Sequence, residues 1–214
     1  TVRATLGAGG FINPEIRGLD ASLEMPGLFE GGGKASLGDG KLDLALSASI
    51  VPLNIGAFAS LSYEECVGAK KLVFAIGVDL PGPIPLANSG LGIYGLGGIF
   101  GVNAALPQPN GQDPVLFQLK LDPFDTSKYG CAPNGGVFGL GAVIGTVPDL
   151  GYAFSARAVV VVGLPDFALR ASLDGAVVNT RREMGNWGTE PAPGLTFLGL
   201  LNIAPDGVTI ALRG

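Results

Sequence analysis

The sequence predicts an all-β fold: antiparallel sheets of about ten to twelve strands, arranged as a sandwich or as an open curved sheet or barrel. Apolar side chains recur at every second residue in several separate segments, which is typical of strands. Gly-containing turn signals lie between these segments, and no window keeps a 3.6-residue apolar period. Hydrophobic residues make up 47% of the chain and charged residues only 14%, which excludes a disordered chain. We expect residues 1–214 to form one domain, which can be a segment of a longer protein.

The first half of the chain contains four segments with strand-like patterns. In residues 41–50 the even positions are apolar, and after Pro52 the apolar positions become odd up to residue 61. Such a phase change at a proline predicts a bend or bulge on an edge. Residues 72–80 alternate in the same way. Residues 90–105 hold six glycines, and each Gly costs about 1 kcal/mol in a helix relative to Ala, so strands or close-packed turns are expected there.

The second half of the chain continues the same pattern. Alternation over residues 115–121, 152–162, 167–173 and 208–212 predicts four more strands. A short helix is the best helical candidate, over residues 181–187. Three turn signals predict hairpins, because their glycines can adopt a positive φ: Asp39-Gly40, Asp174-Gly175 and Pro205-Asp206-Gly207.

The polar sides of these strands carry Ser, Gly, Ala and Asn more often than Lys or Glu. This composition predicts that both faces are partly protected, by packed sheets or by something outside the chain. Eight apolar residues on the alternating segments are expected to line an apolar groove or to form the core: Leu42, Leu44, Leu46, Leu72, Phe74, Ile76, Tyr152 and Phe154.

Charge and residue content exclude several kinds of site. The net charge is −5 and the 13 Lys and Arg residues are scattered, which argues against binding of nucleic acid. The chain has no His, which excludes catalysis by Ser-His-Asp or Cys-His arrangements. Two cysteines without any His are too few for a zinc site. We expect neither a metal nor a cofactor. Cys66 and Cys131 can form one disulfide, but their spacing in the sequence does not show whether they do.

Carboxylate pairs and phosphate-binding motifs give weak signals only. Glu64 and Glu65 are adjacent on a strand and therefore point to opposite faces. Asp122 and Asp125 are expected to cap a turn, with weak calcium binding or acid–base catalysis as the alternative. The segment Gly90–Gly95 has the glycine spacing of a dinucleotide-binding loop but lacks the βαβ context that such a loop requires. We therefore predict no enzymatic activity.

Three Gly-rich segments together resemble a known family. They are PIPLANSGLGIYG at residues 83–95, GGIFGVN at 97–103 and GTVPDLG at 145–151. Their order resembles part of an uncharacterised bacterial family of very large β-rich proteins, classed as a domain of unknown function. The resemblance covers residues 25 to 180 and implies that the chain is one segment of a longer protein. It implies no activity and no catalytic residues.

The expected function is that of a non-enzymatic β module. Its apolar face or groove would bind a lipid, another apolar ligand or neighbouring β segments. Two alternatives remain open: a structural or surface protein that associates with itself, and a membrane β-barrel pore. The sequence leaves the compartment undecided and favours an extracellular or cell-surface location.

Overall fold

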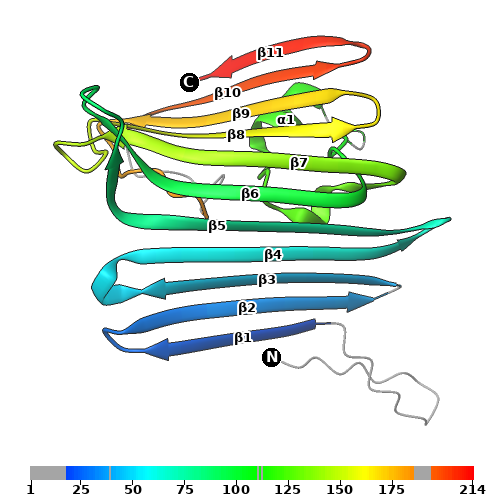
Figure 1. The fold of residues 1–214 in the computed structure, drawn as a ribbon, viewed down its shortest axis with the longest axis horizontal. Coiled ribbons are helices and arrows are strands. Elements are labelled where there is room, and N and C mark those ends of the chain that lie inside the picture. The colour runs from blue at the N-terminus through cyan, green and yellow to red at the C-terminus, as the bar shows by residue number, and fades with distance from the viewer. Residues whose placement is uncertain (1–17, 39, 110, 112, 186–193) are drawn as a thin grey trace.

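A computed structural model of the chain describes residues 18–38, 40–109, 111, 113–185 and 194–214, and its strands form one antiparallel sheet (Figure 1). The 11 described strands lie in the sheet in the order of the chain, so each strand pairs with its neighbours in sequence. The sheet is open, with β1 and β11 at its edges. The all-β prediction is confirmed. The strands are β1 (Gly18–Met25), β2 (Phe29–Gly38), β3 (Lys41–Ile50), β4 (Ile55–Cys66), β5 (Ala69–Pro85), β6 (Leu91–Ala105), β7 (Gly130–Thr146), β8 (Phe154–Leu164), β9 (Ala168–Val177), β10 (Leu195–Ala204) and β11 (Gly207–Arg213).

One predicted strand is a helix. Residues 115–121 were expected to form a strand, but the structure has the helix α1 (Pro114–Lys120) there. The Asp113 side chain accepts hydrogen bonds from the backbone N–H groups of Val115 and Leu116, and Pro114 occupies the first turn. An Asp cap followed by Pro is a strong helix start, and it prevails over the alternation of apolar residues in this short segment.

Two predicted turns also differ. Asp174 and Gly175 lie inside β9 rather than in a hairpin turn, because Asp174 is buried and its carboxylate is held by arginines. Pro52 does not bend a strand; it lies in the 3-10 turn η1 (Val51–Leu53), which connects β3 to β4. Residues 181–185 contain no helix, and the rest of the predicted helix, Trp187 included, lies outside the described residues.

The remaining turn predictions agree with the structure. Gly40 has a φ of 74° in the connection from β2 to β3, while Asp39 lies outside the described residues. Gly207 begins β11 after a tight turn from β10.

The core lies on one face of the sheet, which we call the covered face. The connection between β6 and β7, residues 106–129, folds back over this face and contains α1 and the short 3-10 helix η2 (Thr126–Lys128). Its buried side chains pack against the inner residues of β5 to β8, such as Val73 and Val159. Two glycines make room for the connection: a Cβ atom at Gly97 would lie 2.7 Å from the Phe124 ring, and one at Gly141 would lie 3.1 Å from it.

A disulfide joins Cys66 at the end of β4 to Cys131 near the start of β7, with Cα atoms 6.2 Å apart. Its position fastens the β4–β5 hairpin to the other half of the sheet. In the described part of the chain, no helix has both the length and the apolar character needed to cross a membrane.

Candidate functional site: the uncovered apolar face

The face of the sheet opposite the core consists almost entirely of apolar side chains, and we call it the apolar face. Directly paired residues point to the same side of a sheet, so the strand register defines rows that cross it. One row contains only apolar residues in all 11 strands: Leu19, Ala35, Leu44, Leu61, Phe74, Phe100, Phe138, Val162, Leu169, Ile203 and Val208.

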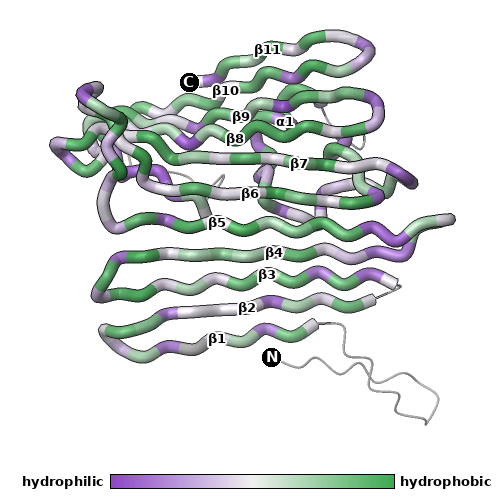
Figure 2. The backbone as a smooth tube through the Cα atoms, in the orientation of Figure 1, coloured by the Kyte–Doolittle hydropathy of each residue, from purple (hydrophilic) through white to green (hydrophobic). Residues whose placement is uncertain are grey.

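A second row lies two residues away and is also free of polar side chains. It contains Ala21, Gly33, Leu46, Ala59, Ile76, Gly98, Leu140, Val160, Ala171, Leu201 and Ile210. The alternation of hydrophobic and hydrophilic residues along the strands that produces these rows is visible in Figure 2.

Large side chains on the apolar face are exposed. The exposed fraction is 59% for Leu46, 56% for Phe100 and 61% for Leu140. Eleven strands spaced about 4.8 Å apart make this face roughly 50 Å wide. The largest apolar patch on an ordinary soluble monomer covers about 300–600 Å². A face of this width is larger than that, and exposed apolar surfaces of such size are typical of interaction sites.

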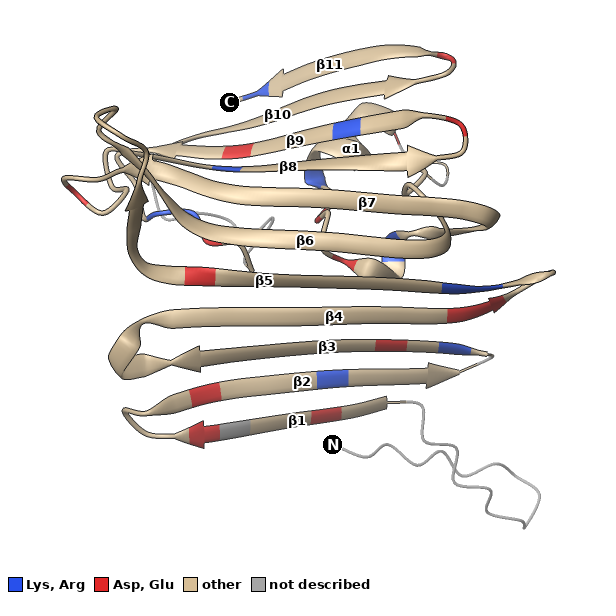
Figure 3. Cartoon of the chain, viewed as in Figure 1, with Lys and Arg blue, Asp and Glu red and all other residues tan. Residues whose placement is uncertain are grey.

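Charged residues are almost absent from this face. Among the described strand residues, the pairing places only Glu65 and Lys70 on this side, and both lie at the tip of the β4–β5 hairpin. Figure 3 shows no charged residue along β6, β7 or β10. The charge pattern therefore marks the end of the apolar surface at this hairpin.

The residues singled out from the sequence lie mainly on this surface. Leu42, Leu44 and Leu46 on β3 share it with Leu72, Phe74 and Ile76 on β5. They are not core: Leu72 and Phe74 are each 39% exposed, and Ile76 is 52% exposed. Tyr152 lies in the turn before β8 and is 55% exposed, while Phe154 begins β8 and is partly buried. These residues were expected to line a groove or to form the core, and the structure places most of them on an exposed sheet face.

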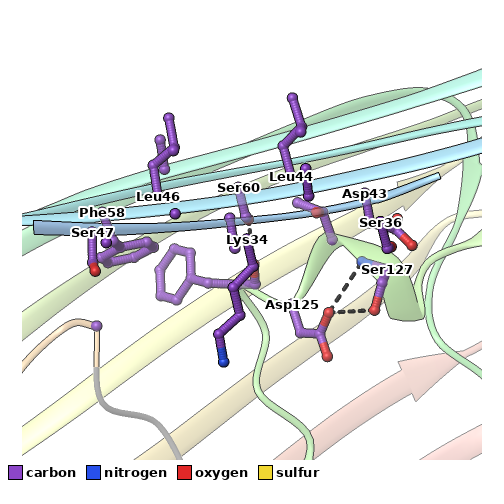
Figure 4. A pocket seen from close by; sticks show the side chains of 18 of the residues that line it. Lys34, Ser36, Asp43, Leu44, Leu46, Ser47, Phe58, Ser60, Asp125 and Ser127 are labelled. Atoms are coloured by element: carbon purple, nitrogen blue, oxygen red, sulfur yellow. Dashed lines mark hydrogen bonds between the residues drawn. The ribbon is translucent and has the colours of Figure 1, made fainter. Parts of the chain in front are cut away.

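The covered face carries polar and apolar side chains together where residues 106–129 leave it open. A cleft of about 690 Å³ lies between β1–β4 and the segment 122–127, and its lining includes Lys34, Asp43 and Ser47. In Figure 4, Lys34 points into the cleft while Leu44 and Leu46 point away from it, towards the apolar face. The first four strands thus separate a partly polar surface from an apolar one.

Buried charges hold the covered face together near β8 and β9. The Asp174 carboxylate lies 2.7 Å from an Arg157 guanidinium nitrogen and 3.0 Å from Arg182 Nε. Arg157 is fully buried and also donates to the carbonyls of Glu183 and Met184, which ties residues 183–184 to the sheet. Burial of Arg170 lowers its pKa to about 10. Arg157, Asp174 and Arg182 have a structural role, because loss of one partner would leave a buried charge without compensation.

The carboxylates proposed as catalytic candidates are engaged in local structure. Asp122 accepts from the Phe124 N–H, and Asp125 caps η2 by accepting from Ser127 N and Oγ. The turn-capping prediction for both residues is confirmed. Burial raises the pKa of Asp122 to about 6. Glu64 forms an ion pair with the buried Lys71 at 2.6 Å, while Glu65 lies on the other face, as alternation requires. In the described part of the chain, no three Cys, Asp or Glu side chains gather where they could hold a metal ion.

Comparison with known proteins gives no relative from which a function could be transferred. The chain matches no protein-family model, no curated protein and no solved structure. The resemblance noted in the sequence therefore stays a prediction.

Proposed function

We propose that the protein is a non-enzymatic β module whose apolar face binds the hydrocarbon of a lipid layer. The observation that carries this proposal is the pair of uninterrupted apolar rows across all 11 strands, exposed in the described structure. Burial of apolar surface is the main source of binding free energy for such a face.

The shape of the surface favours a lipid layer over a small apolar ligand. Small ligands bind in concave pockets of about 300–1,000 Å³ that enclose most of their surface. The cleft of that size in this protein lies on the covered face, and its lining mixes Asp, Ser and Lys side chains with Phe58, Phe124 and Met184. A broad apolar sheet face matches a partner that is itself broad and deformable, and lipid chains have both properties.

The exposed side chains of the apolar face provide the binding free energy. Full burial of a Leu, Ile, Phe or Val side chain contributes about 1.5–3 kcal/mol. Each exposed side chain on this face gains roughly half of that, because it is already about half-buried against its neighbours. Burying ten such side chains therefore yields on the order of 10 kcal/mol, which is comparable with the roughly 4–15 kcal/mol that association costs.

Neighbouring residues on β3 provide a matched test. Leu46 and Ser47 are both exposed and point to opposite faces. In a Trp187→Phe background, we expect bromine-labelled phospholipid vesicles to quench the fluorescence of a Leu46→Trp variant strongly and that of Ser47→Trp weakly. Contact with the bromine atoms requires immersion of the side chain in the acyl-chain region.

Vesicle flotation of the same two variants serves as the control for binding itself. Equal quenching of both tryptophans would contradict the assignment of the lipid-binding face. Failure of the unmodified protein to float with the vesicles would overturn the proposed function.

A further inference from the structure

The covered face contains a buried arginine whose charge is not paired. Arg170 on β9 is only 3% exposed, and its Nε and Nη2 atoms are buried without a hydrogen-bond partner. With a pKa of about 10, the guanidinium is still charged at neutral pH. Native proteins almost always pair a buried charge and satisfy its hydrogen-bond donors. A buried guanidinium without such partners therefore indicates a place for an anion.

The residues around Arg170 do not supply the counter-charge. Arg157, which is also buried, forms an ion pair with Asp174, but no ion pair between described residues involves Arg170. The group that interacts electrostatically with Arg170 is the phenol of Tyr129. Burial raises the pKa of Tyr129, so this phenol is neutral at pH 7.

The acidic residues of the adjoining turns do not neutralise it either. Asp166 lies between β8 and β9, and Asp206 lies between β10 and β11; both are exposed. Neither forms an ion pair with a described residue, and neither contributes to the pKa of Arg170. The positive charge of Arg170 is thus uncompensated within the part of the chain that the structure describes.

Two further hydrogen-bond donors lie beside Arg170 on the same face. The strand register places Arg170 opposite Asn202 of β10, and Asn202 opposite Thr209 of β11. Directly paired residues share a face, with Cβ atoms about 5 Å apart. Both Asn202 and Thr209 are partly exposed, and no described residue forms a hydrogen bond with the amide of one or the hydroxyl of the other. Guanidinium, amide and hydroxyl therefore form a row that leads from the buried side chain towards solvent.

We propose that Arg170, Asn202 and Thr209 bind an oxyanion, the phosphate or carboxylate group of a small soluble molecule. The planar guanidinium presents its N–H donors in a fork that matches the oxygen atoms of either group. The amide and the hydroxyl donate to the remaining oxygens. The connection of residues 106–129 borders the row, because Tyr129 lies near Arg170 and α1 contacts β10 and β11 (Figure 1).

The location of this row favours a soluble ligand over a lipid headgroup. Arg170 lies opposite the buried Val161 and shares the covered face with it, on the side of the sheet away from the apolar face. The proposal therefore goes beyond lipid binding and does not depend on it.

Calorimetric titration in non-ionic detergent, at constant ionic strength, tests the site. We expect the wild-type protein to bind inorganic phosphate, acetate or both, and Arg170→Met to bind neither. Arg213→Met is the matched control, since it removes an exposed arginine at the end of β11 and should leave the Kd unchanged. Phosphate should also raise the melting temperature of the wild-type protein more than that of Arg170→Met, because a ligand stabilises the folded state that binds it.

The partly exposed members of the row give a second test that leaves the core intact. Asn202→Ala/Thr209→Val should weaken binding about tenfold or more, because it removes hydrogen bonds to a charged group. No binding of either anion by the wild-type protein, or equal binding by the wild type and the double variant, would overturn the proposal. Quenching of Leu46→Trp by bromine-labelled lipid should be the same with and without Arg170→Met, so either proposal can fail without the other.

Discussion

At the scale of single residues, the burial of charge is the main feature of the covered face. A hydrogen bond from the Phe124 backbone N–H and the nearby charge of Arg157 both lower the pKa of Asp122. Burial has the larger effect and raises this pKa to about 6. The ionised carboxylate is therefore costly in the folded state.

This cost predicts a pH-dependent effect of Asp122→Asn. The folded-state pKa of about 6 lies above the unfolded value of 3.8, so the ionised side chain destabilises the fold above pH 6, and protonation removes the cost as the pH falls towards 4. We expect the substitution to raise the free energy of unfolding at pH 8 by on the order of 1–3 kcal/mol and to change it little at pH 4. Urea unfolding at both pH values measures the difference, and an equal effect at the two would contradict the burial argument.

The residues that sequence analysis misjudged are those whose roles depend on distant partners. The dipeptide Asp174-Gly175 has the local character of a turn, but Asp174 meets Arg157, 17 residues away, and Arg182 in the folded state. No local pattern records such a pairing, whereas the caps made by Asp122 and Asp125 involve neighbours two residues away and could be predicted.

At the scale of elements, the high Gly content has a specific use in β6 and β7. Gly97 and Gly141 lie under the Phe124 ring, so the connection of residues 106–129 can approach the sheet closely. Phe124 also contacts Phe58 edge to face, with ring centroids 5.2 Å apart.

We therefore expect Gly97→Ala to destabilise the protein by about 1–3 kcal/mol, because the new methyl group would displace the Phe124 ring. Gly38→Ala is the matched control: nothing lies within 4 Å of its added methyl group, and its φ is ordinary, so the change should stay within about 0.5 kcal/mol. Thermal unfolding of both variants gives the comparison. Equal melting temperatures of the two variants would show that the Phe124 ring can move without loss of stability.

Strands were the most predictable elements. Residues 41–50 coincide with β3, and the segments 72–80 and 208–212 fall inside β5 and β11. The period of two survives in the structure because each strand has one face towards the core and one away from it. The helix α1 was missed because seven residues are too few for a helical period to show, and the signal that could have found it was the Asp113-Pro114 start.

At the scale of the whole molecule, the disulfide closes a long covalent loop. Cys66 and Cys131 are 65 residues apart, and a loop of this length is expected to contribute about 4 kcal/mol by restricting the unfolded chain. We expect the double variant Cys66→Ser/Cys131→Ser to lose an amount of this order in guanidinium unfolding. Added reductant should lower the stability of the wild-type protein to that of the variant and leave the variant unchanged; a reductant effect on the variant would point to another cause.

The sequence predicted the sheet but not which of its faces would be covered. Both sides of the strands have low charge, and the apolar residues at alternate positions suit a core as well as an exposed surface. The decision comes from the connection after β6, which packs on the side of Val73 and Val159 and leaves the side of Leu72 and Phe74 open. That choice depends on packing between segments far apart in the chain, which periodicity does not describe.

The order of the strands affects how the sheet folds and how its number of strands can change. Every strand finds its partners directly before and after it in the chain, so the sheet can assemble hairpin by hairpin without waiting for remote segments to meet. A meander of this kind also has no inherent size. Duplicating or deleting a hairpin would add or remove two strands of the sheet. The apolar side chains of the other strands would still point to the same face.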